Sequence, residues 1–211
     1  MASVVQICNM ALSHIGSEAR VSSISPPDGS VEAGYCSAFY DMARTELLEP
    51  GIWRFALARA SLAQNASNAS STWLYAYALP PTCMAPRRVL RAGAGLTVFT
   101  QDNALYDPSD DDSAGFTVEG DVLYTNEPDA VLVYVRDVTD TTKFTPSFTS
   151  ALSYLLASYL AGPIVKGGEG MKLGDGMRER ALALADMAAA ASANASSTSA
   201  YTSASIVGVR A

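Results

Sequence analysis

The chain of 211 residues contains a single histidine, His14, and this residue limits the catalytic chemistry that the sequence can support. A serine hydrolase needs a histidine base beside its nucleophile, and Ser13 and Ser17 lie close to His14 in sequence. Such a serine-rich chain places serines near any histidine, so this proximity does not indicate a catalytic set. His14 is instead expected at the C-terminal end of a helix, where the negative end of the helix dipole favours a histidine side chain.

Two other stretches share only part of a known binding motif. The run 107–113 holds four aspartates, but a calcium loop needs alternating ligands, a central glycine and a distal glutamate. The segment 167–172 combines glycines with Lys172, but Leu173 follows where a phosphate-binding loop has Ser or Thr. We therefore expect a solvent-exposed acidic loop over 107–113 and no nucleotide site.

Cysteine and histidine are too scarce for a zinc site, because Cys8, Cys36 and Cys83 are widely separated in sequence. Cys8 and Cys36 fall within helical patterns, so we expect both to be small core residues in a reducing compartment. The sequence therefore predicts no catalytic residue, no metal and no cofactor.

Composition and charge narrow the function further. The net charge is −7 and charged residues make up 17% of the chain, below the usual quarter of a soluble domain. An acidic chain does not bind nucleic acid by neutralising phosphates, and so few charges favour an oligomer. We expect no signal peptide, and no membrane span because Gly162 and Pro163 interrupt the most apolar stretch, 152–165. The sequence indicates a protein made in the cytoplasm and kept there or packed into a particle.

Apolar periodicity predicts helices at both ends of the chain. Ser3 and Ser30 are suitable N-caps for two helices, which end at Gly16 and Pro50. A third helix starts at Pro146 and is disturbed near its end by Gly162 and Pro163. An alanine-rich fourth helix is expected over 177–195. The glycine-rich stretch 167–176 predicts a loop or a poor helix, since each glycine within a helix costs about 1 kcal/mol.

Between these helices the period changes to two, which predicts strands. A bend after Ile52 should lead into the first strand. Pro80, Pro81 and Pro86 mark the entry to the β region. Gly120 predicts a hairpin tip. The further strands are expected over 73–79, 88–92, 97–100, 104–106, 115–119, 122–125 and 130–138.

Together these elements predict an α+β fold. An antiparallel helical bundle from both chain ends (1–60 and 144–195) would carry an inserted small antiparallel β domain (61–143) and an extended C-terminal tail (196–211). The tail ends in apolar residues that suit addition to a partner. We expect its interface residues to be Ser199, Tyr201, Ile206, Val207, Val209 and Arg210.

Several short segments follow one another in an order that is typical of one protein family. They are 11–16 (ALSHIG), 53–56 (WRFA), 77–81 (YALPP), 124–126 (YTN), 132–134 (LVY) and 144–146 (FTP). The set resembles the tail tubular protein A and head-to-tail adaptor family of tailed bacteriophages over about residues 4–190. The stretch 167–176 departs from the family's fourth helix.

The resemblance implies a structural virion protein rather than an enzyme. Twelve copies would form a ring in the phage neck between the portal protein and a tail nozzle or the next neck protein, assembled in the host cytoplasm. Genomic DNA would pass through the channel without specific binding, and no membrane is involved. A tail terminator, which is typically six-fold, or another neck or tail completion protein remains an alternative. A phage-encoded hydrolase would need paired carboxylates in a cleft.

Overall fold

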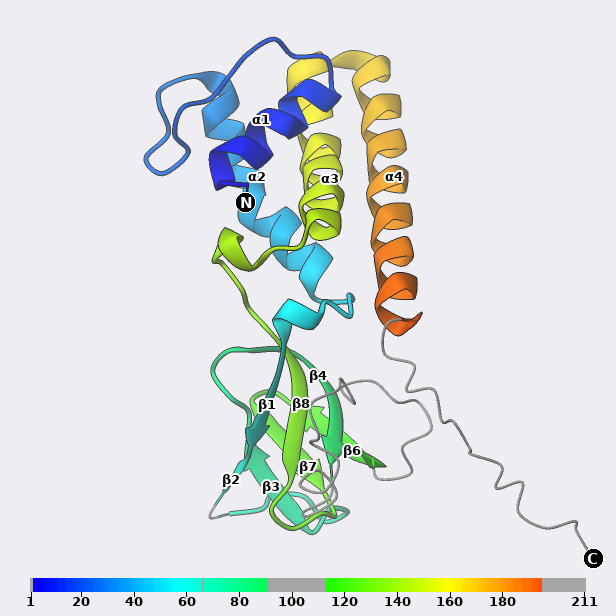
Figure 1. Cartoon of the computed structure of the whole chain (residues 1–211). Coiled ribbons are helices and arrows are strands. Elements are labelled where there is room, and N and C mark those ends of the chain that lie inside the picture. The colour runs from blue at the N-terminus through cyan, green and yellow to red at the C-terminus, as the bar shows by residue number, and fades with distance from the viewer. Residues whose placement is uncertain (1, 66, 91–112, 195–211) are drawn as a thin grey trace, which may run out of the picture.

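The computed structural model describes residues 2–65, 67–90 and 113–194. Within these ranges, four helices gather at one end of the molecule and two small antiparallel sheets form the other end (Figure 1). The chain runs through two helices, then the strands, then two more helices, so it leaves the helical region once and returns. The predicted α+β class is confirmed.

The first two helices begin at their predicted caps. For α1 (Val4–His14), the Ser3 hydroxyl accepts a hydrogen bond from the backbone N–H of Gln6, whose side chain accepts one from the N–H of Ser3. This reciprocal capping box satisfies two of the donors that a helix start leaves free. Ser30 caps α2 (Val31–Leu48) with a single bond, in which its hydroxyl accepts from the backbone N–H of Ala33.

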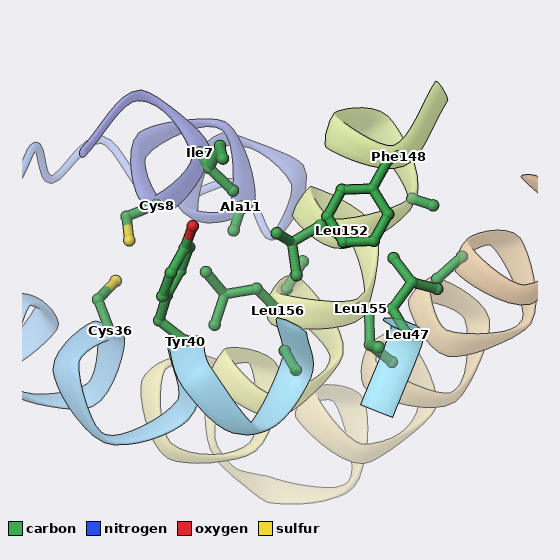
Figure 2. Close-up of a cluster of buried hydrophobic side chains, with 14 of the residues drawn as sticks. Ile7, Cys8, Ala11, Cys36, Tyr40, Leu47, Phe148, Leu152, Leu155 and Leu156 are labelled. Carbon is green, nitrogen blue, oxygen red and sulfur yellow. The ribbon is translucent and has the colours of Figure 1, made fainter. Parts of the chain in front are cut away.

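The third helix, α3 (Pro146–Val165), packs against α1, α2 and α4 (Figure 1). Its side chains Leu152, Leu155 and Leu156 lie in the core between the helices (Figure 2). The expected disturbance at Gly162 does not end the helix, because Pro163 falls in the last turn and removes only one backbone donor there.

By length and composition, α3 would be sufficient to cross a membrane, with 20 residues and a mean hydropathy of 1.4. The expectation that no stretch is long and apolar enough is therefore wrong by these criteria. However, 56% of the apolar window of α3 is buried inside the protein. The apolar composition is accounted for by the helices packed around α3.

The fourth helix, α4 (Gly167–Asn194), includes the glycine-rich stretch, so the prediction of a loop or a poor helix there is wrong. A Cβ added at Gly170 would lie 2.8 Å from the carbonyl oxygen of Ala161 on α3. One turn later, a Cβ at Gly174 would lie 2.9 Å from the carbonyl oxygen of Ser158. The glycines are needed because the two helix backbones approach closely at this seam.

Eight strands form two sheets in the described residues. The first sheet has the order β1-β8-β4-β5, from β1 (Leu57–Ser61), β8 (Val131–Arg136), β4 (Cys83–Leu90) and β5 (Ser113–Ala114). The second has the order β2-β3-β7-β6, from β2 (Ala63–Gln64), β3 (Tyr75–Ala78), β7 (Val122–Thr125) and β6 (Phe116–Glu119). Their shared core contains Tyr77, Val89, Leu123, Ala130, Leu132 and Tyr134.

Several predicted strands occur, some with shifted ends. The prediction for 122–125 matches β7, and Gly120, with φ +59°, forms the turn between β6 and β7. Pro86 was expected to mark the entry to the β region but lies within β4, where a shift in pairing with β8 accommodates it. The strands predicted over 97–100 and 104–106 lie outside the described residues.

Arg44 on α2 joins the helical region to the strands. Its side chain is only 4% exposed and donates to the carboxylate of Asp137 and, at 3.0 Å, to the carbonyl oxygen of Val138, just after β8. Burial alone would lower the pKa of Arg44, but its bonds to Asp137 and Asp41 outweigh burial and raise it. The charged guanidinium therefore fixes the point where the chain re-enters the helical region.

The seam between α3 and α4 predicts opposite effects for two neighbouring glycines. Gly174→Ala forces the backbones apart and is expected to lower the free energy of unfolding by about 1–3 kcal/mol. Gly176, which has open space around its Cβ position, serves as the matched control. Gly176→Ala should raise stability by roughly 0.5–1 kcal/mol through helix propensity. Urea unfolding measures both, and a Gly174→Ala protein as stable as Gly176→Ala would contradict the close seam.

Candidate interaction surface

His14, the candidate base, lies at the end of α1 and faces α3. Its Nε2 is 3.0 Å from the hydroxyl oxygen of Ser153, which is fully buried and donates to the carbonyl oxygen of Ser150 at 2.8 Å. Ser13 and Ser17 are the serines close to His14 in sequence, and nothing in the sequence pairs His14 with the distant Ser153. Because solvent does not reach the Ser153 hydroxyl, this contact serves to join α1 to α3.

An aromatic stack covers the other side of the same contact. The His14 ring stacks on Tyr154 with centroids 3.9 Å apart, and the Arg180 guanidinium lies 5.1 Å from the Tyr154 ring centre. Burial lowers the pKa of His14, and the positive charge of Arg180 lowers it further. His14 is therefore held in its neutral form at neutral pH.

Within the described ranges, no three His, Cys, Asp or Glu side chains lie close enough together to bind a metal ion. The four aspartates expected in an acidic loop lie at 107–112, outside the described residues. The six interface residues expected in the C-terminal tail, from Ser199 to Arg210, also lie outside them.

A chain of side-chain contacts instead crosses α2, α3 and α4 on one outer face. Tyr35 stacks with Phe39 at 6.3 Å, and Phe39 stacks with Tyr159 of α3 at 5.8 Å. The Tyr159 hydroxyl donates to the Glu46 carboxylate, which also accepts from Arg178 of α4. These five residues define what we call the α2–α4 face. Burial and the bond to Glu46 raise the pKa of Tyr159, so its hydroxyl remains a donor.

Exposed apolar side chains surround the α2–α4 face. On α2, Val31 and Met42 are exposed and lie on the same side as Tyr35, because their spacing follows the helical repeat. On α4, Met171 and Leu182 lie on the same side as Arg178, and they are 67% and 48% exposed.

The composition of this face matches that of protein interfaces. Tyrosine, methionine and arginine are enriched at protein–protein contacts, and an exposed apolar patch rimmed by polar groups marks such a contact. The α2–α4 face is therefore the candidate site for binding another protein.

The apolar residues of α2 cover a broad face of the helix. The structure divides that face, since Cys36 and Tyr40 are buried against α1 and α3 whereas Tyr35, Phe39 and Met42 lie at or near the surface. The width of this apolar face was the available sign of a second contact surface, because a helix that packs on one side needs only a narrower apolar stripe.

No protein-family model matches this chain, and no curated protein shows significant sequence similarity to it. The resemblance to phage adaptors rests on the ordered segments in the sequence alone. The function is therefore inferred from the architecture and from the α2–α4 face.

The burial of His14 predicts a pH-dependent stability. Its pKa in the folded protein is below the ordinary 6.5, so the unfolded chain binds more protons below that pH. The free energy of unfolding should therefore fall as the pH drops from about 7 to about 5.5, and His14→Gln should remove this part of the dependence. An NMR titration of the single histidine measures the pKa directly. A pKa at or above 6.5 would contradict the burial of the ring.

Proposed function

We propose that this chain is a structural subunit of the neck of a tailed bacteriophage. It forms a ring that connects the portal protein to the tail and leaves a channel for genomic DNA. The observation that carries the proposal is the α2–α4 face, which offers aromatic, methionine and arginine side chains for protein contact beside a β region inserted between two pairs of helices.

A closed ring requires two different complementary surfaces on each subunit. The α2–α4 face supplies the first. A second lies on another side of α4, where the exposed Met187 and the stacked Arg180 are turned away from Leu182 by the helical repeat. In the proposed ring, the α2–α4 face of one subunit contacts the Met187 side of the next.

The charge of the chain suits a channel through which DNA moves. With a net charge of −7, the chain has no excess of positive charge to neutralise DNA phosphates. In the proposal, DNA passes through the channel without tight or specific binding. The subunit has a structural role and no enzymatic one.

The alternative is another completion protein of the neck or tail, such as a tail terminator. The two functions predict different stoichiometries, because the adaptor ring has twelve copies and a terminator ring typically six. Native mass spectrometry of the chain with and without the portal ring of the same phage separates them. Twelve copies per portal ring support the adaptor, whereas a free six-copy ring with no portal binding contradicts it.

The α2–α4 face can be tested in the same assay. Met42→Glu and Leu182→Glu each place a charge in the proposed subunit contact and are expected to lower ring assembly on the portal at least ~10-fold. Leu74→Glu is the control, since Leu74 is also an exposed apolar residue, at 71%, but lies next to β3. Equal assembly by all three variants would exclude this face from the ring contact.

Deletion of 196–211 tests the residues expected in the tail. The truncated chain should still fold but should no longer attach to the portal, because the sequence predicts that the tail adds to a partner. Circular dichroism checks the fold of the truncated chain. Normal attachment without the tail would remove Ser199–Arg210 from the portal contact.

A further inference from the structure

Two cysteines that are distant in sequence meet in the helical core. Cys8 on α1 and Cys36 on α2 are both fully buried and free. Figure 2 shows their sulfur atoms pointing toward each other across the interface between the two helices. The two thiols are hydrogen-bonded to each other. Their helical patterns predict that both are core residues, but no pattern in the sequence predicts that they are neighbours.

The shared hydrogen bond makes the two thiols chemically unequal. The bond to Cys36, together with burial, raises the pKa of Cys8. The same bond lowers the pKa of Cys36, with burial opposing it. A thiolate on Cys36 is therefore stabilised by the S–H of Cys8, and the thiolate is the nucleophile in disulfide exchange.

We propose that Cys8 and Cys36 form an intramolecular disulfide when the protein meets a small-molecule disulfide as oxidant. The bond joins α1 to α2 covalently. The bond forms only under oxidising conditions, because a reducing environment keeps both thiols free. This inference goes beyond the proposed function and does not depend on it.

The reaction proceeds by two exchanges. The Cys36 thiolate attacks one sulfur of the small disulfide and releases its other half as a thiolate, which takes up the proton lost from Cys36. Cys8 then loses its proton and attacks the Cys36 sulfur of the mixed disulfide, which releases the second small thiol. Two protein thiols are oxidised, and one small disulfide is reduced to two thiols.

Access to the pair requires α1 to move. Both sulfur atoms are buried beneath α1, which packs on α3 through Ile7, Ala11 and Leu12. The reaction therefore follows local opening of this short N-terminal helix, which is a lower-energy event than global unfolding. Cys83 on β4 is only partly buried and could react without such an opening, so it is replaced in the test below.

The test uses full-length protein carrying Cys83→Ala, so that two thiols remain. After incubation with oxidised glutathione, the intact mass should fall by two hydrogens, and non-reducing peptide mapping should link the peptides of Cys8 and Cys36. The thermal midpoint should rise by roughly 5–15 °C, because the crosslink constrains the unfolded chain. Low urea concentrations that leave the protein folded should speed the reaction by opening α1.

Control variants separate the bond from a packing effect. Cys8→Ser and Cys36→Ser, each in the Cys83→Ala background, should show no rise in thermal midpoint with the oxidant. If either variant does not fold, the peptide map of the parent protein still decides. A lasting glutathione adduct, crosslinked dimers, or two free thiols after incubation in low urea would each overturn the proposal.

Discussion

The arrangement of the two regions depends on one buried cation, Arg44. Removing a guanidinium from water costs several kcal/mol unless other acceptors replace the water. Asp137 and the carbonyl oxygen of Val138 are these acceptors, and both belong to the segment that returns from β8 to the helices. Where the chain departs, Arg87 of β4 donates to the carbonyl oxygens of Glu49 and Gly51. Charged groups thus fix both crossings between the helices and the sheets.

With the crossings fixed, α3 becomes the common partner of the other helices, and the packing around it decides what remains exposed. Gly170 and Gly174 bring α4 close to α3, and His14 joins α1 to it through Ser153. On another side of α3, the contacts between Tyr159, Glu46 and Arg178 draw α2 and α4 together at the surface. The packing that completes the core also creates the α2–α4 face, so stability and the proposed assembly share one set of helices.

The sequence predicted those features that local rules decide. Ser3 and Ser30 were predicted as N-caps because each directly precedes a helical pattern of apolar residues. Gly120 was predicted as a turn residue from the short hairpin segment alone. The helical form of 167–176 could not be predicted, because the cost of each glycine is local whereas the benefit is close contact with a helix elsewhere in the chain. Likewise, no local rule states which part of the apolar face of α2 is buried, so the half-buried positions of Tyr35 and Phe39 were not predicted. The pairings of His14 with Ser153 and of Cys8 with Cys36 depend on tertiary packing alone.

The most direct test of the proposed neck assignment is a count of the copies of this chain in purified phage particles, because the proposal requires a phage to encode it. Quantitative mass spectrometry with labelled reference peptides gives this number relative to the portal protein. The account predicts one copy of this chain for each portal subunit, since both would form rings of the same symmetry. Half that ratio, or the absence of the chain from the particles, would contradict a ring seated on the portal.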